Sequence, residues 1–318
     1  MNHPEISVCI ITYNQQDYIR QCVESALAQA ADVSLEILVG DDCSQDSTGV
    51  ILAELAAAYP DMIRYIRHEP RLGACRNIQA VLAEARGNYV AHLDGDDYWL
   101  PGKLKHQLAF MMANPDCAAV YTNALTVNEA GSAIGFFNDV GDLRFDLAAL
   151  LRKGNFLNAS SVMMRASLVA QVLEIEGQFI DYREHLRHAR KGFLAQIGQP
   201  LVGYRVNSVG SMVLSSNDLV RMLYWEAILD VPRELVTDLD FALGLTDFFR
   251  RVAFRAVKLR RWGLLREWVP PVFRASPFGV IRTTLLILWA IARMTYVELV
   301  GRIPIGLSRR RIKVLYRR

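Results

Sequence analysis

Residues 89–101 read YVAHLDGDDYWLP, an apolar run that ends in three acids within four residues. Asp94 and Asp96 stand two apart with Gly95 between them, so a tight turn can direct both carboxylates toward one cation. A hard divalent ion held in this way keeps waters and binds phosphate oxygens, which is the chemistry of holding a diphosphate. The alternative is an Asx-type turn, in which the acids only accept hydrogen bonds from local backbone. The sequence before the motif favours the cation site.

Short β-branched apolar runs recur along the N-terminal third of the chain, at residues 6–12, 35–40, 63–67 and 89–93. Segments with helical periodicity separate them, so the spacing predicts βαβ units. Right-handed crossovers then give an α/β fold with a doubly wound, mainly parallel sheet and flanking helices. Ligands of such sheets collect at the carboxyl ends of the strands. The candidate residues stand at these ends: Tyr13, Asn14, Asp41, Asp42, Asp94 and Asp96.

The remaining pattern is less regular and lacks two nucleotide-binding motifs. Beyond Pro101 it predicts a helix to about Asn114 and a strand at residues 118–122, then irregular sequence to Asp142 and an apolar segment around residues 160–164. No GxGxxG follows the first strand and no GxxxxGK[ST] occurs, which argues against a nicotinamide dehydrogenase and a P-loop nucleotide hydrolase. We therefore expect phosphates to be held through a metal.

The composition is that of a globular, intracellular chain. The 318 residues are 52% hydrophobic and 22% charged, enough for a sizeable core. The five cysteines are odd in number and form no CxxC pair, which favours free thiols in a reducing cytosol. The first apolar run, residues 6–11, is too short for a signal peptide or a spanning helix. We expect the catalytic half to stay on the cytoplasmic side.

The net charge of +3 conceals a strongly basic C-terminal region. Residues 248–318 contain 17 Lys and Arg but only two acids, Glu267 and Glu298. Such a region is typical of a nucleic-acid arm or a membrane-surface anchor. Many large apolar side chains are interleaved with the basic ones, which favours an anionic lipid surface over nucleic acid.

A membrane-spanning helix is not expected in this region. Only 10 uncharged residues lie between Arg282 and Arg293, too few for about 30 Å of hydrocarbon. The segment is expected to lie in the interface, with Arg309, Arg310 and Arg311 toward anionic headgroups, or to pack on its own domain. The alternative is an ordinary helical subdomain with a solvated basic face.

Residues 6 to about 210 resemble the family 2 glycosyltransferases, which are inverting enzymes of the GT-A fold that use nucleotide sugars. Matching stretches occur in order along the chain: SVCIITYNQQDYIRQCVESALAQ (7–29), ILVGDDCSQDST (37–48), GACRN (73–77), ARGNYVAHLDGDDYWLPGKLKHQ (85–107), and FIDYREHLRHARKG (179–192) followed by PLVGYRVNSVGS (200–211). The resemblance implies a GT-A nucleotide-sugar-binding and catalytic domain at residues 1–215. Residues 216–318 then form a helical, basic C-terminal region.

The resemblance implies roles for residues at the first two strand ends. Tyr13 matches the position that packs on the nucleotide base, although a tyrosine at the rim of the site with a satisfied hydroxyl is the plain alternative. Asp42 matches the acid that accepts the base N–H, which gives a preference for uracil or thymine. Asp41 is expected to be a helix-capping or turn residue. In the alternative, Asp46 or Ser44 caps the next helix and neither Asp41 nor Asp42 contacts a ligand.

Further matches fall on the third helix and the acidic motif. Arg76 lies near the family's basic residue at the nucleotide site. Asp94 matches the acid that contacts the ribose or the metal shell, and Asp96 the direct ligand of a divalent metal, Mn²⁺ or Mg²⁺, that joins the diphosphate. Asp97 is expected to cap the turn before Pro101.

Asp181 matches the family's catalytic base, which removes the proton of the acceptor hydroxyl. Ile180 stands where the family more often has a second acid, and Glu184 is the reserve base. The spacing of Asp181 and Glu184 is also that of a capping box, so a structural role stays open. His185 and His188 could mimic a metal pair, but we expect surface or core histidines because no third ligand is apparent.

The family's YRxH loop, whose histidine helps close over the diphosphate, appears here as residues 204–207. Asn207 replaces the histidine and cannot take a positive charge. Contact with the diphosphate is therefore expected to move to Arg205, which can pair directly with phosphate oxygens.

Together these features predict a metal-dependent inverting transferase that moves a sugar from a UDP-sugar to a hydroxyl of a glycan or lipid-linked acceptor in cell-surface polysaccharide synthesis. We expect it at the inner face of the plasma membrane. A sugar-phosphate nucleotidyltransferase normally has a glycine-rich phosphate loop near the first strand, which is missing here. An inactive glycan-binding or membrane scaffold would predict loss of Asp96 or Asp181, and both are present.

Overall fold

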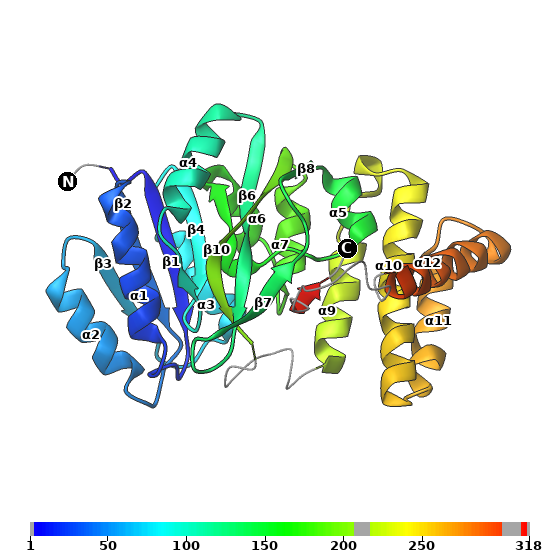
Figure 1. Cartoon of the computed structure of the whole chain (residues 1–318), viewed down its shortest axis with the longest axis horizontal. Coiled ribbons are helices and arrows are strands. Elements are labelled where there is room, and N and C mark those ends of the chain that lie inside the picture. The colour runs from blue at the N-terminus through cyan, green and yellow to red at the C-terminus, as the bar shows by residue number, and fades with distance from the viewer. Residues whose placement is uncertain (1–2, 207–216, 301–312, 317–318) are drawn as a thin grey trace, which may run out of the picture.

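The computed structural model describes residues 3–206, 217–300 and 313–316. A mixed, mostly parallel sheet forms the centre of the molecule and helices cover it, with a group of helices at the C-terminal end (Figure 1). The order of the main run of strands is β11-β7-β6-β9-β4-β1-β2-β3, and β10 pairs with β5, β6 and β8. The mainly parallel α/β sheet predicted from the sequence is therefore confirmed.

The strands are β1 (Ile6–Thr12), β2 (Leu35–Asp41), β3 (Ile63–Arg67), β4 (Tyr89–Asp94), β5 (Tyr98–Trp99), β6 (Cys117–Val127), β7 (Ala133–Asn138), β8 (Leu143–Phe145), β9 (Met163–Arg165), β10 (Phe193–Arg205) and β11 (Lys313–Tyr316). The helices are α1 (Ile19–Leu27), α2 (Thr48–Ala58), α3 (Ala74–Ala83), α4 (Lys103–Ala113), α5 (Leu147–Lys153), α6 (Val169–Leu173), α7 (Asp181–His188), α9 (Asn217–Leu229), α10 (Asp238–Leu259), α11 (Gly263–Ala275) and α12 (Val280–Val300).

The parallel half of the sheet brings the predicted strand ends to one edge. β1 pairs in parallel with β2 and β4, and β2 with β3. Thr12 is opposite Asp41, and Ile11 is opposite Asp94. Because these partners are the last or second-last residues of their strands, the loops after β1, β2 and β4 leave the sheet side by side.

Helices cover both faces of this half because its strands are apolar on both faces. Ile6, Val8 and Ile10 of β1 pack in a cluster that includes the buried side chains of α1 and α2. Cys9 points to the opposite face, into the cluster that contains α3. The alternation of side chains along β1 thus fixes the doubly wound arrangement.

The second half of the sheet departs from the sequence pattern. β6 runs to Val127, beyond the predicted end at Thr122, and β7 lies in the stretch expected to be irregular. β7 is antiparallel to β6, and only two of its side chains, Phe137 and Asn138, are buried, so its hydrophobic pattern is too weak to predict a strand. β9 inserts antiparallel between β4 and β6.

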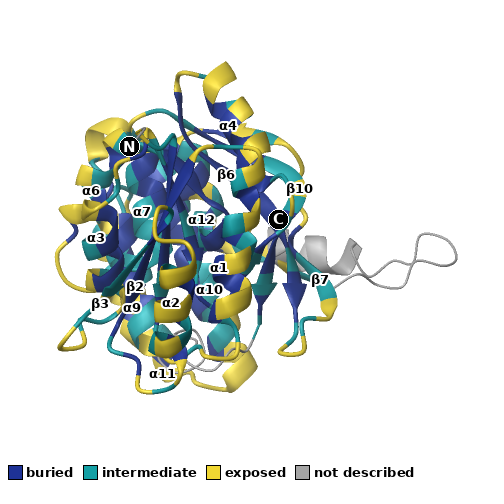
Figure 2. Ribbon diagram, turned by 90° about the vertical axis from the view of Figure 1, so that its left-hand side faces the viewer, coloured by how far each residue is buried: buried dark blue, intermediate teal, exposed yellow. Residues whose placement is uncertain are grey.

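The helices of the C-terminal region pack against the part of the chain that forms the sheet. Leu150 and Leu151 of α5 share one buried cluster with Phe241 and Leu245 of α10. Coloured by burial, the strands of the sheet are mainly buried, whereas the helices that cover it have exposed stretches (Figure 2). The expected domain boundary, near residue 215, lies outside the described residues, as do the Arg309–Arg311 triplet and Asn207. Within the described segments, no helix combines the length and apolar character needed to cross a bilayer. All five cysteines are free thiols, as predicted.

Candidate active site

Asp94 ends β4 and is held by two polar side chains. His92 Nε2 donates to Asp94 Oδ1 at 3.0 Å, and Ser160 Oγ lies 3.2 Å from Asp94 Oδ2. Burial by itself raises the pKa of Asp94, but His92 and Ser160 outweigh it and the net shift is downward. Asp94 therefore stays ionised, and its side chain is 37% exposed at the edge of the sheet.

Gly95 is required by close packing of the acidic turn on β1. Its N–H donates to the carbonyl of Ile11, and a Cβ at this position would lie 2.8 Å from Thr12 Cβ. The turn carries Asp96, which is half-buried, next to Asp94. The motif thus places two adjacent carboxylates at the end of β4.

Asp97 does not cap the turn before Pro101, contrary to expectation. Its buried carboxylate accepts from Ser160 Oγ at 2.6 Å and from the backbone N–H of Arg205 at 2.8 Å. Asp97 therefore fastens the end of β10 to the acidic turn. Burial and the charges of Asp96 and Asp94 raise its pKa well above the ordinary value.

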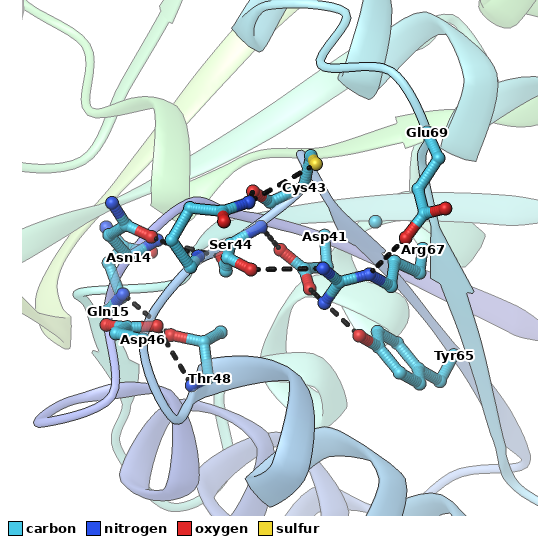
Figure 3. A network of polar contacts seen from close by, with 12 residues as sticks. Asn14, Gln15, Asp41, Cys43, Ser44, Asp46, Thr48, Tyr65, Arg67 and Glu69 are labelled. Carbon is cyan, nitrogen blue, oxygen red and sulfur yellow. Dashed lines mark hydrogen bonds and ion pairs between the residues drawn. The ribbon is translucent and has the colours of Figure 1, made fainter.

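Asp41 is a turn residue, as the sequence predicts. Its Oδ1 accepts from the backbone N–H of Ser44, and its Oδ2 accepts from Tyr65 Oη at 2.8 Å and pairs with Arg67 at 3.4 Å (Figure 3). The carboxylate is completely buried in this network. These contacts stabilise the loop after β2 and engage both oxygens of the Asp41 carboxylate with protein groups.

The loops after β1 and β2 brace each other. Asn14 N–H donates to Ser44 Oγ, and Gln15 N–H donates to Thr48 Oγ1 (Figure 3). Asp46 accepts from the N–H groups of Gln16 and Thr48, so it caps the start of α2. These bonds make a rigid wall beside Tyr13 and Asp42.

Asp42 holds the loop before α3 in place. Its nearly buried carboxylate accepts from the N–H groups of Leu72 and Gly73 and pairs with Arg71 Nε at 3.2 Å. The Arg71 guanidinium carbon also lies 3.6 Å from the centre of the Tyr13 ring, a cation–π contact. Tyr13, Asp42 and Arg71 therefore form one group at the end of β1 and β2.

The two basic residues predicted to contact the nucleotide or the diphosphate, Arg76 and Arg205, differ in their exposure. Arg76 is exposed on the first turn of α3. Arg205 is 7% exposed, donates to Gln21 Oε1 and to the carbonyl of Glu129, and packs over the Tyr18 ring at 4.6 Å. In this conformation the Arg205 guanidinium contacts protein groups, so contact with a phosphate requires it to release Gln21 or Glu129.

Asp181 is the first residue of α7, with Ile180 at the N-cap position, so the capping box suggested by the spacing does not form. Asn155 Nδ2 donates to both carboxylate oxygens of Asp181 at 3.2 Å, and the N–H of Tyr182 donates to Oδ1. Burial raises the pKa of Asp181 to about 6, although the bonds from Asn155 and Tyr182 oppose the shift.

The acids of β4 and α7 belong to one electrostatic group. The charges of Asp94 and His92 shift the pKa of Asp181, and the same two residues shift the pKa of Glu184. Burial, opposed by His92 and reinforced by Asp181 and Asp94, raises the pKa of Glu184 to about 7. The sheet edge thus combines the ionised carboxylate of Asp94 on β4 with the raised-pKa carboxylates of Asp181 and Glu184 on α7.

His185 and His188 are core histidines, as expected. Both are 1% exposed, and their Nδ1 atoms lie 2.9 and 3.4 Å from the hydroxyl oxygen of Tyr121. Burial lowers both pKa values, that of His188 to about 4, so both rings are neutral. Within the described residues, no group of three or more His, Cys, Asp or Glu side chains is arranged to hold a metal.

The donor chemistry of the β4 turn nevertheless fits a hard divalent ion. Mg²⁺ and similar ions are commonly held by one or two carboxylates plus substrate phosphates and waters, without a complete protein cage. Asp94 is ionised and partly exposed, and Asp96 is adjacent to it. These two residues therefore suit a metal that arrives with a diphosphate.

Four further residues shape the site but were missed from the sequence: His92, Ser160, Asn155 and Arg71. His92 precedes Asp94 by two residues, so strand alternation placed it on the same face and could have indicated it. Arg71 lies two residues before the GACRN stretch. Ser160 and Asn155 come from loops distant in sequence, and no local pattern signals their contacts with Asp94 and Asp181.

Comparison with known proteins agrees with this arrangement. The model of the glycosyl transferase family 2 matches residues 7–171. The putative teichuronic acid biosynthesis glycosyltransferase TuaG of Bacillus subtilis is 32% identical over 213 residues, which cover 65% of this chain and 82% of TuaG. The chain belongs to glycosyl transferase family 2.

Two other comparisons extend the likeness. Rv1520 of Mycobacterium tuberculosis is 32% identical over 225 residues, or 70% of this chain, and the match spans 64% of that protein's length. The crystal structure of Staphylococcus aureus TarS 1–349 with UDP-GlcNAc has a TM-score of 0.68 at 17% identity and covers 93% of this chain and 87% of that one. The fold is therefore the GT-A fold of such transferases.

Proposed function

We propose that the protein is an inverting glycosyltransferase that moves a sugar from a UDP-sugar to a hydroxyl of a glycan or lipid-linked acceptor. The observation that carries the proposal is the electrostatic group of Asp94 and Asp181, which combines an ionised acid at the end of β4 with a raised-pKa acid on α7. The first suits a site for a metal and a diphosphate, and the second suits a general base.

The nucleotide is proposed to bind at the ends of β1 and β2. Tyr13 offers a stacking face for the base, and Asp42 an acceptor for its imide N–H. Arg71, which now lies over Tyr13, must yield this face to the base and then stands beside the ribose or the diphosphate together with Arg76. The structure of TarS as a complex with UDP-GlcNAc supports a uridine nucleotide.

Asp94 and Asp96 would hold a divalent ion, Mn²⁺ or Mg²⁺. A bound ion of this kind neutralises the charge that develops on a departing diphosphate. His92 and Ser160 fix the orientation of Asp94 for this role. Arg205 is proposed as a further contact to the diphosphate.

Asp181 is proposed to remove the proton of the acceptor hydroxyl as that oxygen attacks the anomeric carbon in line with the leaving group. A pKa of about 6 leaves the carboxylate ionised at neutral pH and makes it a stronger base than an ordinary aspartate. Asn155 holds both carboxylate oxygens and so sets their direction. Glu184, with a pKa of about 7, is the reserve base.

We infer a division into a catalytic domain, residues 1–215, and a basic helical region, residues 216–318, that attaches the protein to the inner face of the plasma membrane. Attachment there would place the sheet edge beside a lipid-linked acceptor. The name of TuaG supports a role in surface polysaccharide synthesis.

The direct test is turnover of nucleotide sugars. The purified protein is incubated with a panel of UDP- and GDP-sugars and Mn²⁺, and release of the nucleoside diphosphate is measured with and without bacterial glycolipid acceptors. We expect release from a UDP-sugar that an acceptor accelerates and that Asp181→Asn abolishes. Release unchanged in Asp181→Asn would refute the assignment of the base. The absence of both nucleotide release and UDP binding would favour an inactive scaffold.

A further inference from the structure

The end of α10 and the turn that leads to α11, residues 257–262, expose large apolar side chains together with basic ones. Val257 and Trp262 are each 58% exposed and Leu259 is 46% exposed. Lys258, Arg260 and Arg261, which lie between them, are exposed as well. We call these six residues the 257–262 tip.

The apolar residues of the tip do not belong to the core that holds the helices together. α10 buries Val252 and Ala256 on its inner side, and α11 buries Leu264 and Trp268. Arg260 adopts left-handed backbone angles, φ 55° and ψ 28°, so the chain reverses sharply at the tip. Single exposed apolar residues are ordinary, but three within six residues at a turn are a local concentration of exposed apolar surface.

The tip lies on the same side of the molecule as the candidate active site. Arg261, in the tip, pairs at 3.5 Å with Asp218, near the start of α9. In Figure 1 the turn from α10 to α11 and the start of α9 are at the lower edge, as are the carboxyl ends of β1 and β6. A surface that docks the tip would therefore run beside the sheet edge.

The positive charge around the tip favours an anionic partner. No acid occurs between Asp247 and Glu267, and the nearby Asp218 is already paired with Arg221 and Arg261. Lys and Arg next to a bilayer are attracted by anionic lipids, and tryptophan prefers the headgroup region. Exposed Val257 and Leu259 gain from burial at the acyl boundary but contribute little to a contact with phosphates and bases alone. We propose that the 257–262 tip is the part of the basic helical region that docks onto an anionic phospholipid bilayer, an inference that rests on the membrane attachment proposed above.

A second apolar surface provides an internal control. α12 exposes Leu285, Leu288 and Trp289 on one face, while Thr283 and Ile287 on the other face are buried. Trp289 is 53% exposed, close to the value for Trp262. Among the α12 residues whose side chains the structure describes, 280–292, only Arg282 is basic, whereas three of the six tip residues are basic. The two tryptophans therefore distinguish a strongly basic apolar site from a mainly apolar surface.

The test is flotation of the full chain with vesicles of phosphatidylcholine alone and of phosphatidylcholine mixed with phosphatidylglycerol. We expect binding to the mixed vesicles only, weakened by salt. Trp262→Ser should lower the partition coefficient on the order of tenfold and Lys258→Gln about fivefold, while Trp289→Ser leaves it unchanged. All three side chains are exposed, and thermal melting checks that the variants fold.

Several results would overturn the proposal. They are no binding to either vesicle, equal binding to both, or loss of binding in Trp289→Ser but not in Trp262→Ser. Binding of a single-stranded oligonucleotide in place of vesicles, lost in Trp262→Ser, would instead assign the tip to nucleic acid. Vesicle binding requires no catalysis, so its outcome is independent of the glycosyl-transfer assay.

Discussion

Replacing Asn155 by alanine should move the acid limb of the pH–rate profile to higher pH. The native rate is expected to rise as Asp181 ionises with a pKa of about 6. Asn155 donates to both oxygens of this carboxylate, and these bonds favour the ionised form. Without them less of the base is ionised at a given pH below neutrality, so the variant is slower there and recovers at higher pH.

The size of the shift follows from the geometry. A hydrogen bond to a charged group contributes about 1.5–3 kcal/mol when its geometry is favourable and it is shielded from water. Both bonds here are 3.2 Å long and the Asp181 side chain is 36% exposed, so a net effect of about 1 kcal/mol is reasonable. At 1.36 kcal/mol per pKa unit, the limb should move upward by about 0.5–1 pH unit.

The assay is the initial rate of nucleoside diphosphate release at saturating acceptor across the pH range from about 5 to 8. Asn128→Ala, in the β6–β7 turn, is the matched control and should leave the profile unchanged, since the Asn128 side chain accepts from Ser132 N–H within the same turn. A lower rate with an unmoved limb in Asn155→Ala would refute the link between Asn155 and the ionisation of the base.

Three further substitutions test other parts of the site. Asp181→Asn should lower turnover by about 10²–10⁴-fold. Because the pKa of Asp181 is raised, its ionised side chain destabilises the folded protein near neutral pH. The melting temperature of the variant should therefore equal or exceed that of the native protein. Asp230→Asn should lower the free energy of unfolding by about 2–4 kcal/mol in urea titrations. Asp230, which follows α9, pairs with three arginines: Arg183 and Arg187 in α7, and Arg190 just after it. Burial raises the pKa of Asp230, but the three arginines outweigh burial and hold this pKa well below its usual range. The stability that Asp230 contributes is therefore present above its unfolded-state pKa and is lost only in strong acid. A native-like stability in the variant would contradict this reasoning. Tyr13→Ala should weaken UDP binding by about 1–3 kcal/mol in calorimetry, and an unchanged affinity would place the base elsewhere.

The parallel core and the acidic motif could be predicted from sequence because their signals are local. The four N-terminal strands are apolar runs with strict spacing, and β1 and β3 begin and end where the pattern predicts. The turn role of Asp41 followed from its place at the end of the second apolar run, where β2 ends. β7 was missed because half-exposed strands carry a weak hydrophobic pattern.

The contacts that tune the site could not be predicted because they depend on tertiary structure. Ser160 reaches Asp94 and Asp97 only because β9 inserts beside β4. Asn155 reaches Asp181 from the loop after α5. The link from Asp97 to the backbone of Arg205 joins residues more than a hundred positions apart, so its spacing suggested only a local cap.

The acids of the β4 turn are the centre of the proposed donor site, and calorimetric titration of UDP tests them most directly. The native protein and Asp96→Asn are each titrated with UDP in Mn²⁺ and in chelator, with Asp61→Asn, at the turn before β3, as a control. We predict binding that requires Mn²⁺ in the native protein and the control and is lost in Asp96→Asn. UDP binding that is equally strong in chelator and in Asp96→Asn would contradict a metal-held diphosphate at the end of β4.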